Sequence, residues 1–246
     1  DAIELADAAR GALVAAGQSD RAVTPTSATT GLRPLHPPIP PTALVGREPE
    51  VAAACAFLRQ ADRPGQTRLL TLTGPGGVGK TRLALAVAEA ARTQAATVCF
   101  VDLAVISDAT LLPAAIAQAL GLREQGVRET LDQIVDVANE RDLLLVLDNF
   151  EHVQAAASSV SALLSRCPSL QLLVTSRSPL RIQGERELPI SPLAVPPEEE
   201  APHAMQSLLE YPGVRLFVER AQAVDPGFRL TEENGDTVAA ICRRLD

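Results

Sequence analysis

Short apolar runs alternate with amphipathic stretches through the middle of the chain. The runs are Arg68–Thr73, Thr97–Leu103, Leu143–Leu147, Leu170–Thr175 and the shorter Arg186–Ile190. Leu143–Leu147 contains no polar residue, as expected of a strand that is buried on both faces. Because helical spacing returns between the runs, the pattern predicts an α/β fold, with a parallel five-stranded sheet covered by helices on both faces.

The stretches between these runs repeat apolar residues at helical spacing. Helices are predicted at Pro49–Gln60, Thr81–Arg92, Thr110–Gly121, Arg128–Glu140 and Val153–Arg166. Two more are predicted near the end of the chain, at Tyr211–Ala223 and Thr231–Leu245, and their apolar stripes favour packing over ligand binding.

Changes in composition divide the chain. Residues 1–17 have the apolar stripe of a short helix, and residues 18–42 form a linker rich in Ser, Thr and Pro. We expect the nucleotide-binding domain proper to span residues 43–191. Residues 192–246 then form a second linker and the first helices of a helical lid domain. We also expect that the chain is a fragment of a longer protein.

Composition excludes several classes of function. The 246 residues carry a net charge of −8, only 2% are aromatic and none is Trp, which argues against a surface built for nucleic acid. Neither a membrane helix nor a secretion signal is present in the sequence. The four cysteines form no CxxC pair, so a reduced cytoplasmic protein without a cysteine-bound metal is expected.

Lys80 is the only lysine among 22 basic residues, and it stands in a phosphate-binding motif. The predicted strand Arg68–Thr73 runs into G-x-x-x-x-G-K-[ST], and a helix follows. The candidate residues are Gly74, Pro75, Gly76, Gly77, Val78, Gly79, Lys80 and Thr81, with Arg82 next in the helix. Glycines let backbone N–H groups turn toward an anion, while Lys80 reaches the β- and γ-phosphates and Thr81 binds Mg²⁺.

A carboxylate ends the most apolar strand. Asp148 follows Leu143–Leu147, and an unpaired carboxylate is costly inside a core, so we interpret it as the second Mg²⁺ ligand. Fast ATPases usually carry an acidic residue at the next position, where this chain has Asn149. Glu151 is a candidate base for the attacking water, with a solvated helix start as the alternative, and Asn149 indicates slow hydrolysis.

The strand Leu170–Thr175 also ends in polar residues. Ligands of open α/β sheets lie at the carboxyl ends of the strands. Arg177 is therefore a candidate contact for the terminal phosphate, with Thr175 or Ser176 hydrogen-bonding to it. The alternative is an ordinary surface arginine after a serine turn.

In this order, the motifs resemble the STAND class of P-loop ATPases and its NB-ARC-like branch. The resemblance covers roughly residues 41–246 and rests on VGRE, LTGPGGVGKTRLALAVA, LLLVLDNFEHV, LLVTSRSPLRIQGE and YPGVRLFVERA. It implies that Val45, Gly46 and Arg47 lie beside the adenine of ATP or ADP. It also implies a slow ATPase switch that self-associates with ATP bound, inside a transcription regulator that binds DNA through a helix-turn-helix domain outside this chain.

Three other interpretations remain. A fast ATPase or phosphotransferase would couple hydrolysis to work, although Asn149 argues against it. A guanine-nucleotide switch would need the lysine of an NKxD motif, and the only lysine is Lys80. A protein-interaction module would carry the motif as a remnant without nucleotide binding.

Overall fold

The structure is a computed structural model that describes residues 37–61, 67–93, 97–122, 127–198 and 205–245. The helix predicted in residues 1–17 and most of the Pro-rich linker 18–42 lie outside the described residues.

Five strands form one sheet in the order β2-β3-β4-β1-β5, and every neighbouring pair is parallel. The strands are β1 (Leu69–Thr73), β2 (Thr97–Asp102), β3 (Leu143–Asp148), β4 (Gln171–Ser176) and β5 (Glu185–Pro189). Each begins and ends within one residue of its predicted run, and the predicted parallel five-stranded sheet is confirmed.

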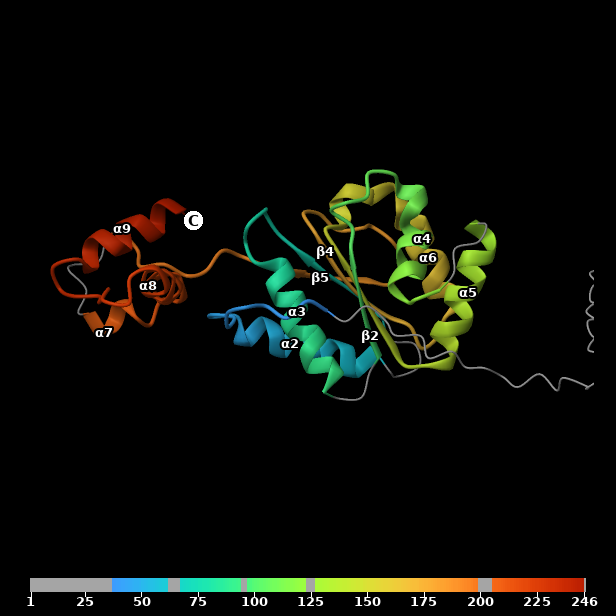
Figure 1. Ribbon diagram of the computed structural model, residues 1–246, viewed down its shortest axis with the longest axis horizontal. Coiled ribbons are helices and arrows are strands. Elements are labelled where there is room, and N and C mark those ends of the chain that lie inside the picture. Colours follow the sequence, from blue (N-terminus) through green and yellow to red (C-terminus); the bar gives the residue numbers. More distant parts are fainter. Residues whose placement is uncertain (1–36, 62–66, 94–96, 123–126, 199–204, 246) are drawn as a thin grey trace, which may run out of the picture. The chain divides into compact units, whose positions relative to one another are not determined.

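Helices cover both faces of this sheet (Figure 1). Two helices pack on one face, α2 (Glu48–Ala61) and α3 (Lys80–Arg92). The opposite face is covered by α4 (Leu112–Ala119), α5 (Val127–Glu140) and α6 (Ala157–Arg166). The sheet therefore lies between two helical layers. The carboxyl ends of its strands remain available for a site.

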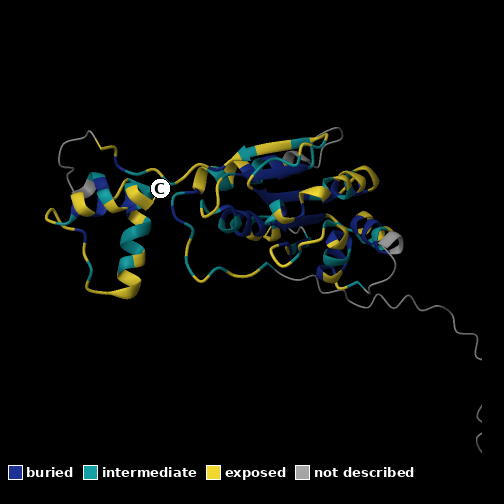
Figure 2. Cartoon of the chain, turned by 90° about the horizontal axis from the view of Figure 1, so that it is seen from above, coloured by how far each residue is buried: buried dark blue, intermediate teal, exposed yellow. Residues whose placement is uncertain are grey.

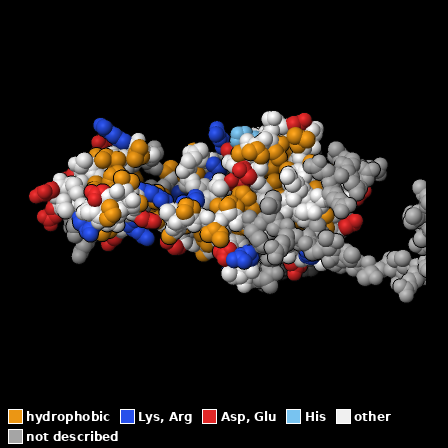
Figure 3. All heavy atoms as spheres, viewed as in Figure 1, with side chains coloured by type: hydrophobic (Ala, Val, Ile, Leu, Met, Phe, Trp, Pro, Cys, Tyr) orange, Lys and Arg blue, Asp and Glu red, His pale blue; other side chains and the backbone are white. Residues whose placement is uncertain are grey.

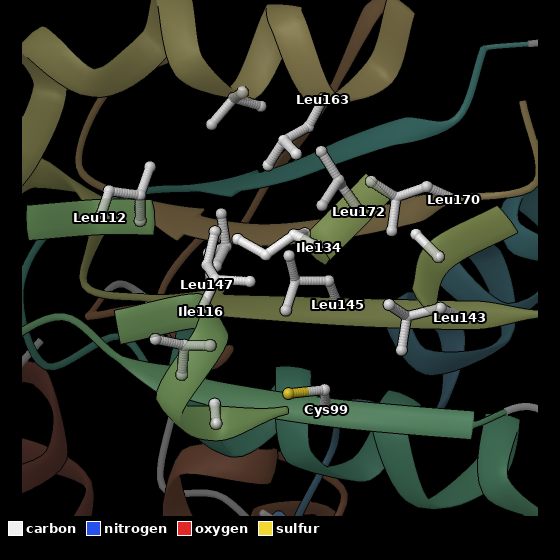
Figure 4. Packing of buried hydrophobic residues seen from close by; sticks show 14 of the residues in the cluster. Cys99, Leu112, Ile116, Ile134, Leu143, Leu145, Leu147, Leu163, Leu170 and Leu172 are labelled. Carbon is white, nitrogen blue, oxygen red and sulfur yellow. The ribbon is translucent and has the colours of Figure 1, made fainter. Parts of the chain in front are cut away.

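The side chains of β3 alternate between the two layers. Leu143, Leu145 and Leu147 pack with α4, α5 and α6 (Figure 4). Leu144 and Val146 pack with α2 and α3. Successive side chains of a strand point to opposite faces, so a strand between two helical layers must be apolar at every position. Figure 2 shows the inner strands of the sheet as mostly buried, whereas the residues of the edge strand β5 are half-buried or exposed.

The predicted helix Val153–Arg166 is wrong in its first turn. A 3₁₀ helix, η2 (Phe150–Ala156), follows β3, and α6 begins only at Ala157. Val153 leaves helical geometry at φ −130° and ψ 35°, and it is buried in the core with Phe150. Packing of these two side chains against the sheet explains the break. Another 3₁₀ turn, η1 (Ala109–Leu111), precedes α4.

Three helices follow β5 along the chain: α7 (Met205–Leu208), α8 (Pro212–Val224) and α9 (Gly235–Leu245). They share a small core made of Leu208, Val214, Leu230, Val238, Ala239 and Cys242. The sequence did not predict α7, and α9 begins four residues later than predicted. The delay has a local cause, since the side-chain oxygen of Asn234 accepts the backbone N–H of Thr231 and holds a turn there. Two apolar residues of α9, Ile241 and Leu245, are exposed.

The surface carries charges of both signs. On the face drawn in Figure 3, acidic and basic side chains are interspersed rather than gathered by sign. Within the part of the chain that the structure describes, no helix is both long enough and apolar enough to cross a membrane.

Candidate functional site

Polar groups gather where β1, β3 and β4 end. Thr73, the last residue of β1, stands beside Ser176, the last residue of β4. Asp148 ends β3 and stands beside Asp102 at the end of β2. Since parallel strands end at one edge of their sheet, these residues and the glycine-rich loop that leaves β1 lie together.

The glycine-rich loop, residues 74–79, leads directly from β1 into α3. Gly74 has φ +150°, and an added Cβ would lie 2.6 Å from the carbonyl oxygen of Ile190. Gly79 precedes α3 with φ 97°, in the left-handed region that glycine adopts at least cost. No heavy atom lies within 4 Å of a Cβ built on Gly77 or Gly79, so the loop has open space beside it.

Lys80 is buried, with 8% of its surface exposed. Its Nζ donates to the carbonyl oxygens of Gly74 and Pro75, each at 2.9 Å. Among the residues that the structure describes, no carboxylate forms an ion pair with it. A buried ammonium group that is solvated only by carbonyl dipoles is unfavourable, and an anion such as phosphate would neutralise it.

Asp148 connects three elements of the site. The Thr81 hydroxyl from α3 lies 2.9 and 3.0 Å from its two carboxylate oxygens, and the Thr175 hydroxyl from β4 donates to Oδ1 at 2.5 Å. Burial raises the pKa of Asp148, and the nearby charges of Asp102 and Glu151 add to this rise. Carboxylate and hydroxyl oxygens are the ligands that Mg²⁺ prefers, so Asp148 and Thr81 are suited to hold it.

The segment after β3 makes contacts that the sequence did not predict. Asn149 has φ 62° and ψ 42°, and its backbone N–H donates to the Thr175 hydroxyl at 2.9 Å. Its side-chain Nδ2 lies 3.1 Å from Asp102 Oδ1 and 3.2 Å from Asp148 Oδ2. Asp102 was missed because the predicted run Thr97–Leu103 continues past it; the signal that could have found it is a carboxylate near the end of an apolar run.

Arg177 and Glu151 form an ion pair, with Arg177 Nε 3.2 Å from Glu151 Oε1. The Glu151 side chain is mostly buried, and its Oε2 has no hydrogen-bond partner in the described part of the chain. Arg177 is exposed and lies above the glycine-rich loop, 3.9 Å from a Cβ built on Gly76. The structure therefore brings Arg177 to the loop and pairs it with Glu151.

Two arginines fix the segment before α2 in place, Arg47 to the glycine-rich loop and Arg82 to α3. Arg47, which is 5% exposed, donates to the carbonyl oxygens of Val78 and Ser191 at 3.1 and 2.6 Å. Arg82 donates to the carbonyl oxygens of Thr42 and Ala43 at 2.6 and 2.9 Å. In the structure, both guanidinium groups bind backbone carbonyl oxygens, so these two residues hold the wall of the site.

A cavity of about 930 Å³ adjoins the loop. This volume lies within the usual range for small-molecule sites. Its lining includes Val45, Arg47, Pro75, Gly76, Gly77, Val78, Gly79 and Arg82, together with Leu216, Phe217, Arg220, Cys242 and Leu245 of the last two helices. The Arg220 guanidinium donates to the Thr42 hydroxyl at 3.0 Å. The cavity thus has one wall formed by the glycine-rich loop and the segment before α2, and one wall from α8 and α9 that is largely apolar apart from Arg220.

Gly46 lies at the junction of the two walls. It has φ +66°, and an added Cβ would lie 2.3 Å from Cβ of Pro212, the first residue of α8. Any larger residue would push α8 away from the segment that carries Val45.

Comparison with known proteins is consistent with this geometry. Residues 43–176 match the family model described as AAA ATPase domain. A Mycobacterium tuberculosis protein whose name describes it as an HTH-type transcriptional regulator is 41% identical over 182 residues, or 74% of this chain. A second protein of that species, which carries no functional name, is 35% identical over 207 residues, or 83% of this chain. The chain spans only 19% of the first protein and 48% of the second.

Two solved structures share the fold. Cdc6p of Pyrobaculum aerophilum superimposes with a TM-score of 0.55 and 19% identity, covering 76% of this chain and 52% of its own. The Orc1 protein of Aeropyrum pernix, solved in complex with DNA, gives a TM-score of 0.50 and 19% identity, covering 75% of this chain and 56% of its own. At this identity the likeness concerns the fold, and it agrees with the predicted P-loop NTPase architecture.

Proposed function

Because the chain belongs to the AAA ATPase domain family, we propose that it is an ATP- and ADP-binding switch with slow ATP hydrolysis. One observation carries the proposal. The buried ammonium group of Lys80, which has only carbonyl partners, lies at the N-terminus of α3 beside a cavity with room for a nucleotide. A helix N-terminus and a buried cation together favour a phosphate chain.

Each part of the site then has a role toward Mg-ATP. The backbone N–H groups of the loop, which all its residues except Pro75 possess, and the Lys80 ammonium hold the β- and γ-phosphates. Thr81 and Asp148, whose oxygens already meet at 2.9 Å, hold Mg²⁺. Bound Mg²⁺ supplies charge neutralisation of the phosphates. Val45 and Arg47 lie on the side of the cavity where we place the base and ribose.

Arg177 is proposed to report the γ-phosphate. In the structure Arg177 pairs with Glu151, and it lies above the loop where we place the terminal phosphate. A phosphate with more negative charge than the carboxylate competes for the guanidinium group. This exchange would free Glu151, the residue proposed as base for the attacking water. ADP has no γ-phosphate and would leave the ion pair intact.

The two walls of the cavity are the parts that the switch would move relative to each other. One wall belongs to the sheet and its loop, and the other to α8 and α9, with Arg220 and Thr42 joining them. A ligand shifts such an arrangement only through a difference in affinity for its two states. The γ-phosphate contact to Arg177 provides a difference between ATP and ADP.

Asn149 favours slow turnover, because an amide cannot take a proton from water as a carboxylate does. The competing function is a fast ATPase or phosphotransferase. Sustained turnover above about 10 s⁻¹, the median for enzymes, would support that alternative and contradict the switch.

The wider setting is also a proposal. The name of the mycobacterial relative suggests a transcription regulator, with DNA bound by a domain outside this chain. The described cysteines are all free thiols, in keeping with a reducing cytoplasm. Self-association in the ATP state is expected. Sedimentation velocity should show faster-moving species with a non-hydrolysable ATP analogue and Mg²⁺, but not with ADP.

The first test replaces Lys80. Lys80→Ala removes the buried cation, and we expect ADP affinity to fall at least about 100-fold, the usual scale for a desolvated charge-assisted contact. Isothermal titration calorimetry measures it. Arg92→Ala is the matched control, since it removes an exposed cation from the same helix. ADP affinity unchanged in Lys80→Ala would refute nucleotide binding at this loop.

A second test distinguishes binding of Mg²⁺ from binding of the phosphates. In Asp148→Ala the Mg²⁺ ligand is lost while the loop and Lys80 remain, so ADP binding without Mg²⁺ should stay near that of the wild type. The increase in ATP affinity that Mg²⁺ gives the wild type should disappear. If Mg²⁺ still strengthens ATP binding in the variant, Asp148 does not hold the metal.

A further inference from the structure

The side-chain amide of Asn149 lies between two carboxylates. Its Nδ2 is 3.1 Å from Asp102 Oδ1 and 3.2 Å from Asp148 Oδ2. These aspartates stand side by side at the ends of β2 and β3. An NH₂ group has two N–H bonds, so a single amide can serve both carboxylates.

This arrangement fixes which way the amide faces. A flipped amide would set its oxygen against two anionic oxygens, so only the NH₂ end can face the aspartates. The oxygen, Oδ1, is turned away from them and has no hydrogen-bond donor among the residues that the structure describes. The hydrogen bond from the Asn149 backbone to Thr175 fixes the residue on its other side.

Asp102 is itself held in place. Its Oδ1 also accepts the backbone N–H of Ala104 at 2.9 Å. The left-handed conformation of Asn149, with φ 62°, is one that asparagine tolerates better than glutamate. A glutamate at this position would be strained and would face two carboxylates. The site is therefore built for an amide, with the acidic residue on β2.

We propose that Asn149 orients the attacking water through Oδ1, and that Asp102 is a positioning residue that keeps the amide in this orientation. The inference rests on the proposed function. In GTPases, an amide side chain likewise orients the attacking water without acting as the base. The pair Asp102–Asn149 would thus supply the orientation of the water, and the proton would be taken by another residue.

The water oxygen forms a bond to the γ-phosphorus while the bond between that phosphorus and the β–γ bridging oxygen breaks. The bridging oxygen leaves on ADP with the electron pair of that bond. The water proton goes to the Glu151 carboxylate, the proposed base, which Arg177 has released. Asn149 accepts a hydrogen bond but no proton, so its contribution is orientation.

The first experiment measures Asp102→Asn in the 246-residue chain. A neutral amide at position 102 can accept from or donate to Asn149, so only Asp148 still favours the NH₂ end and the orientation of the Asn149 amide is held less firmly. We expect kcat for Mg-ATP to fall about tenfold, the effect of losing one charge-assisted hydrogen bond, with KM and ADP affinity unchanged. The matched control is Asp132→Asn, an exposed carboxylate of α5 that pairs with Arg166.

The second experiment exchanges the two residues. Asn149→Asp alone places three carboxylates together and should reduce kcat at least as much as Asp102→Asn. In the double variant D102N/N149D, an amide again faces a carboxylate, with the direction of the hydrogen bond reversed. We expect kcat to recover to the wild-type level or above, which a purely structural role of Asp102 would not produce.

The outcomes are distinct. Wild-type kcat in Asp102→Asn, weaker ADP binding in that variant, or no recovery in the double variant would each overturn the inference. Wild-type turnover no higher than the Lys80→Ala background would also overturn it. Failure of the wild type to bind ADP would instead overturn the proposed function.

Discussion

At the scale of single residues, the site is marked by two buried charged groups that lack an oppositely charged partner among the described residues. Lys80 and Asp148 are both buried, yet neither is ion-paired within the described part of the chain; Lys80 meets two carbonyl oxygens and Asp148 meets hydroxyl and amide groups. Each arrangement costs stability and is favourable only when a ligand of opposite charge arrives. Phosphate and Mg²⁺ supply those two charges together.

This cost gives a prediction for Asp148. Its pKa is raised by burial, so in the pH range between its ordinary and its raised pKa the folded chain binds more protons than the unfolded chain. The free energy of unfolding therefore falls as pH rises through that range. In Asp148→Asn this loss is absent, and without ligand the variant should be more stable than the wild type at pH 7 by about 0.5–2 kcal/mol.

Urea unfolding at several pH values, with a chelator present, measures this difference. The advantage of Asp148→Asn should shrink as pH falls toward 3.8, the ordinary pKa of Asp. Asp132→Asn should show no comparable gain, because its carboxylate is exposed. A variant less stable than the wild type at neutral pH would show that the carboxylate stabilises the empty site.

At the scale of elements, β3 explains why the sheet can support a site at one end. Every residue from Leu143 to Leu147 is buried, with alternate side chains in the two cores. A strand held on both faces is a rigid support for the polar residue that follows it. The same argument applies to β4 and Thr175, which is also buried.

The rigidity of β3 can be tested with Leu145→Ala. The side chain is 0% exposed, and its removal leaves a cavity between β3 and the helices around it. We expect the free energy of unfolding to fall by about 2–5 kcal/mol. Leu111→Ala, at a site that is 50% exposed, should change it by less than about 0.5 kcal/mol. A loss below 1 kcal/mol at Leu145, measured by urea unfolding, would contradict the two-sided core.

At the scale of the whole molecule, the cavity is built from distant parts of the sequence. The segment around Val45, the loop at residues 74–79 and the helices α8 and α9 each supply part of its lining. Their contact depends on close approach, since Gly46 leaves no room between its backbone and Pro212. Nucleotide affinity should therefore depend on a residue that touches neither phosphate nor metal.

Gly46→Ala tests this dependence. The added methyl group would clash with Pro212 and displace α8, so we expect ADP affinity to fall about tenfold, in line with overpacking costs of about 1–3 kcal/mol. Gly184→Ala is the control, because Gly184 also has a positive φ, +80°, but open space around it. Calorimetry should show normal ADP affinity in the control. Equal losses in both variants would point to backbone strain instead of wall contact.

The sequence by itself determined the five strands, the glycine-rich loop, and the positions of Lys80 and Asp148 beside them. Each depends on neighbours within a few residues, because strand alternation, helix starts and turn glycines are local properties. The break at Val153 and the late start of α9 could not be predicted, since core packing and an Asn234 turn override helical spacing there.

Only the tertiary structure decided the partners of those local features. Asn149 meets Asp102 across 47 positions, and Arg177 meets Glu151 across 26. The sequence showed that position 149 holds an asparagine instead of an acidic residue. It did not show that Asp102, on the neighbouring strand β2, lies beside it. Strand order sets which chain ends become neighbours, and strand order depends on the packing of both cores together rather than on any single segment.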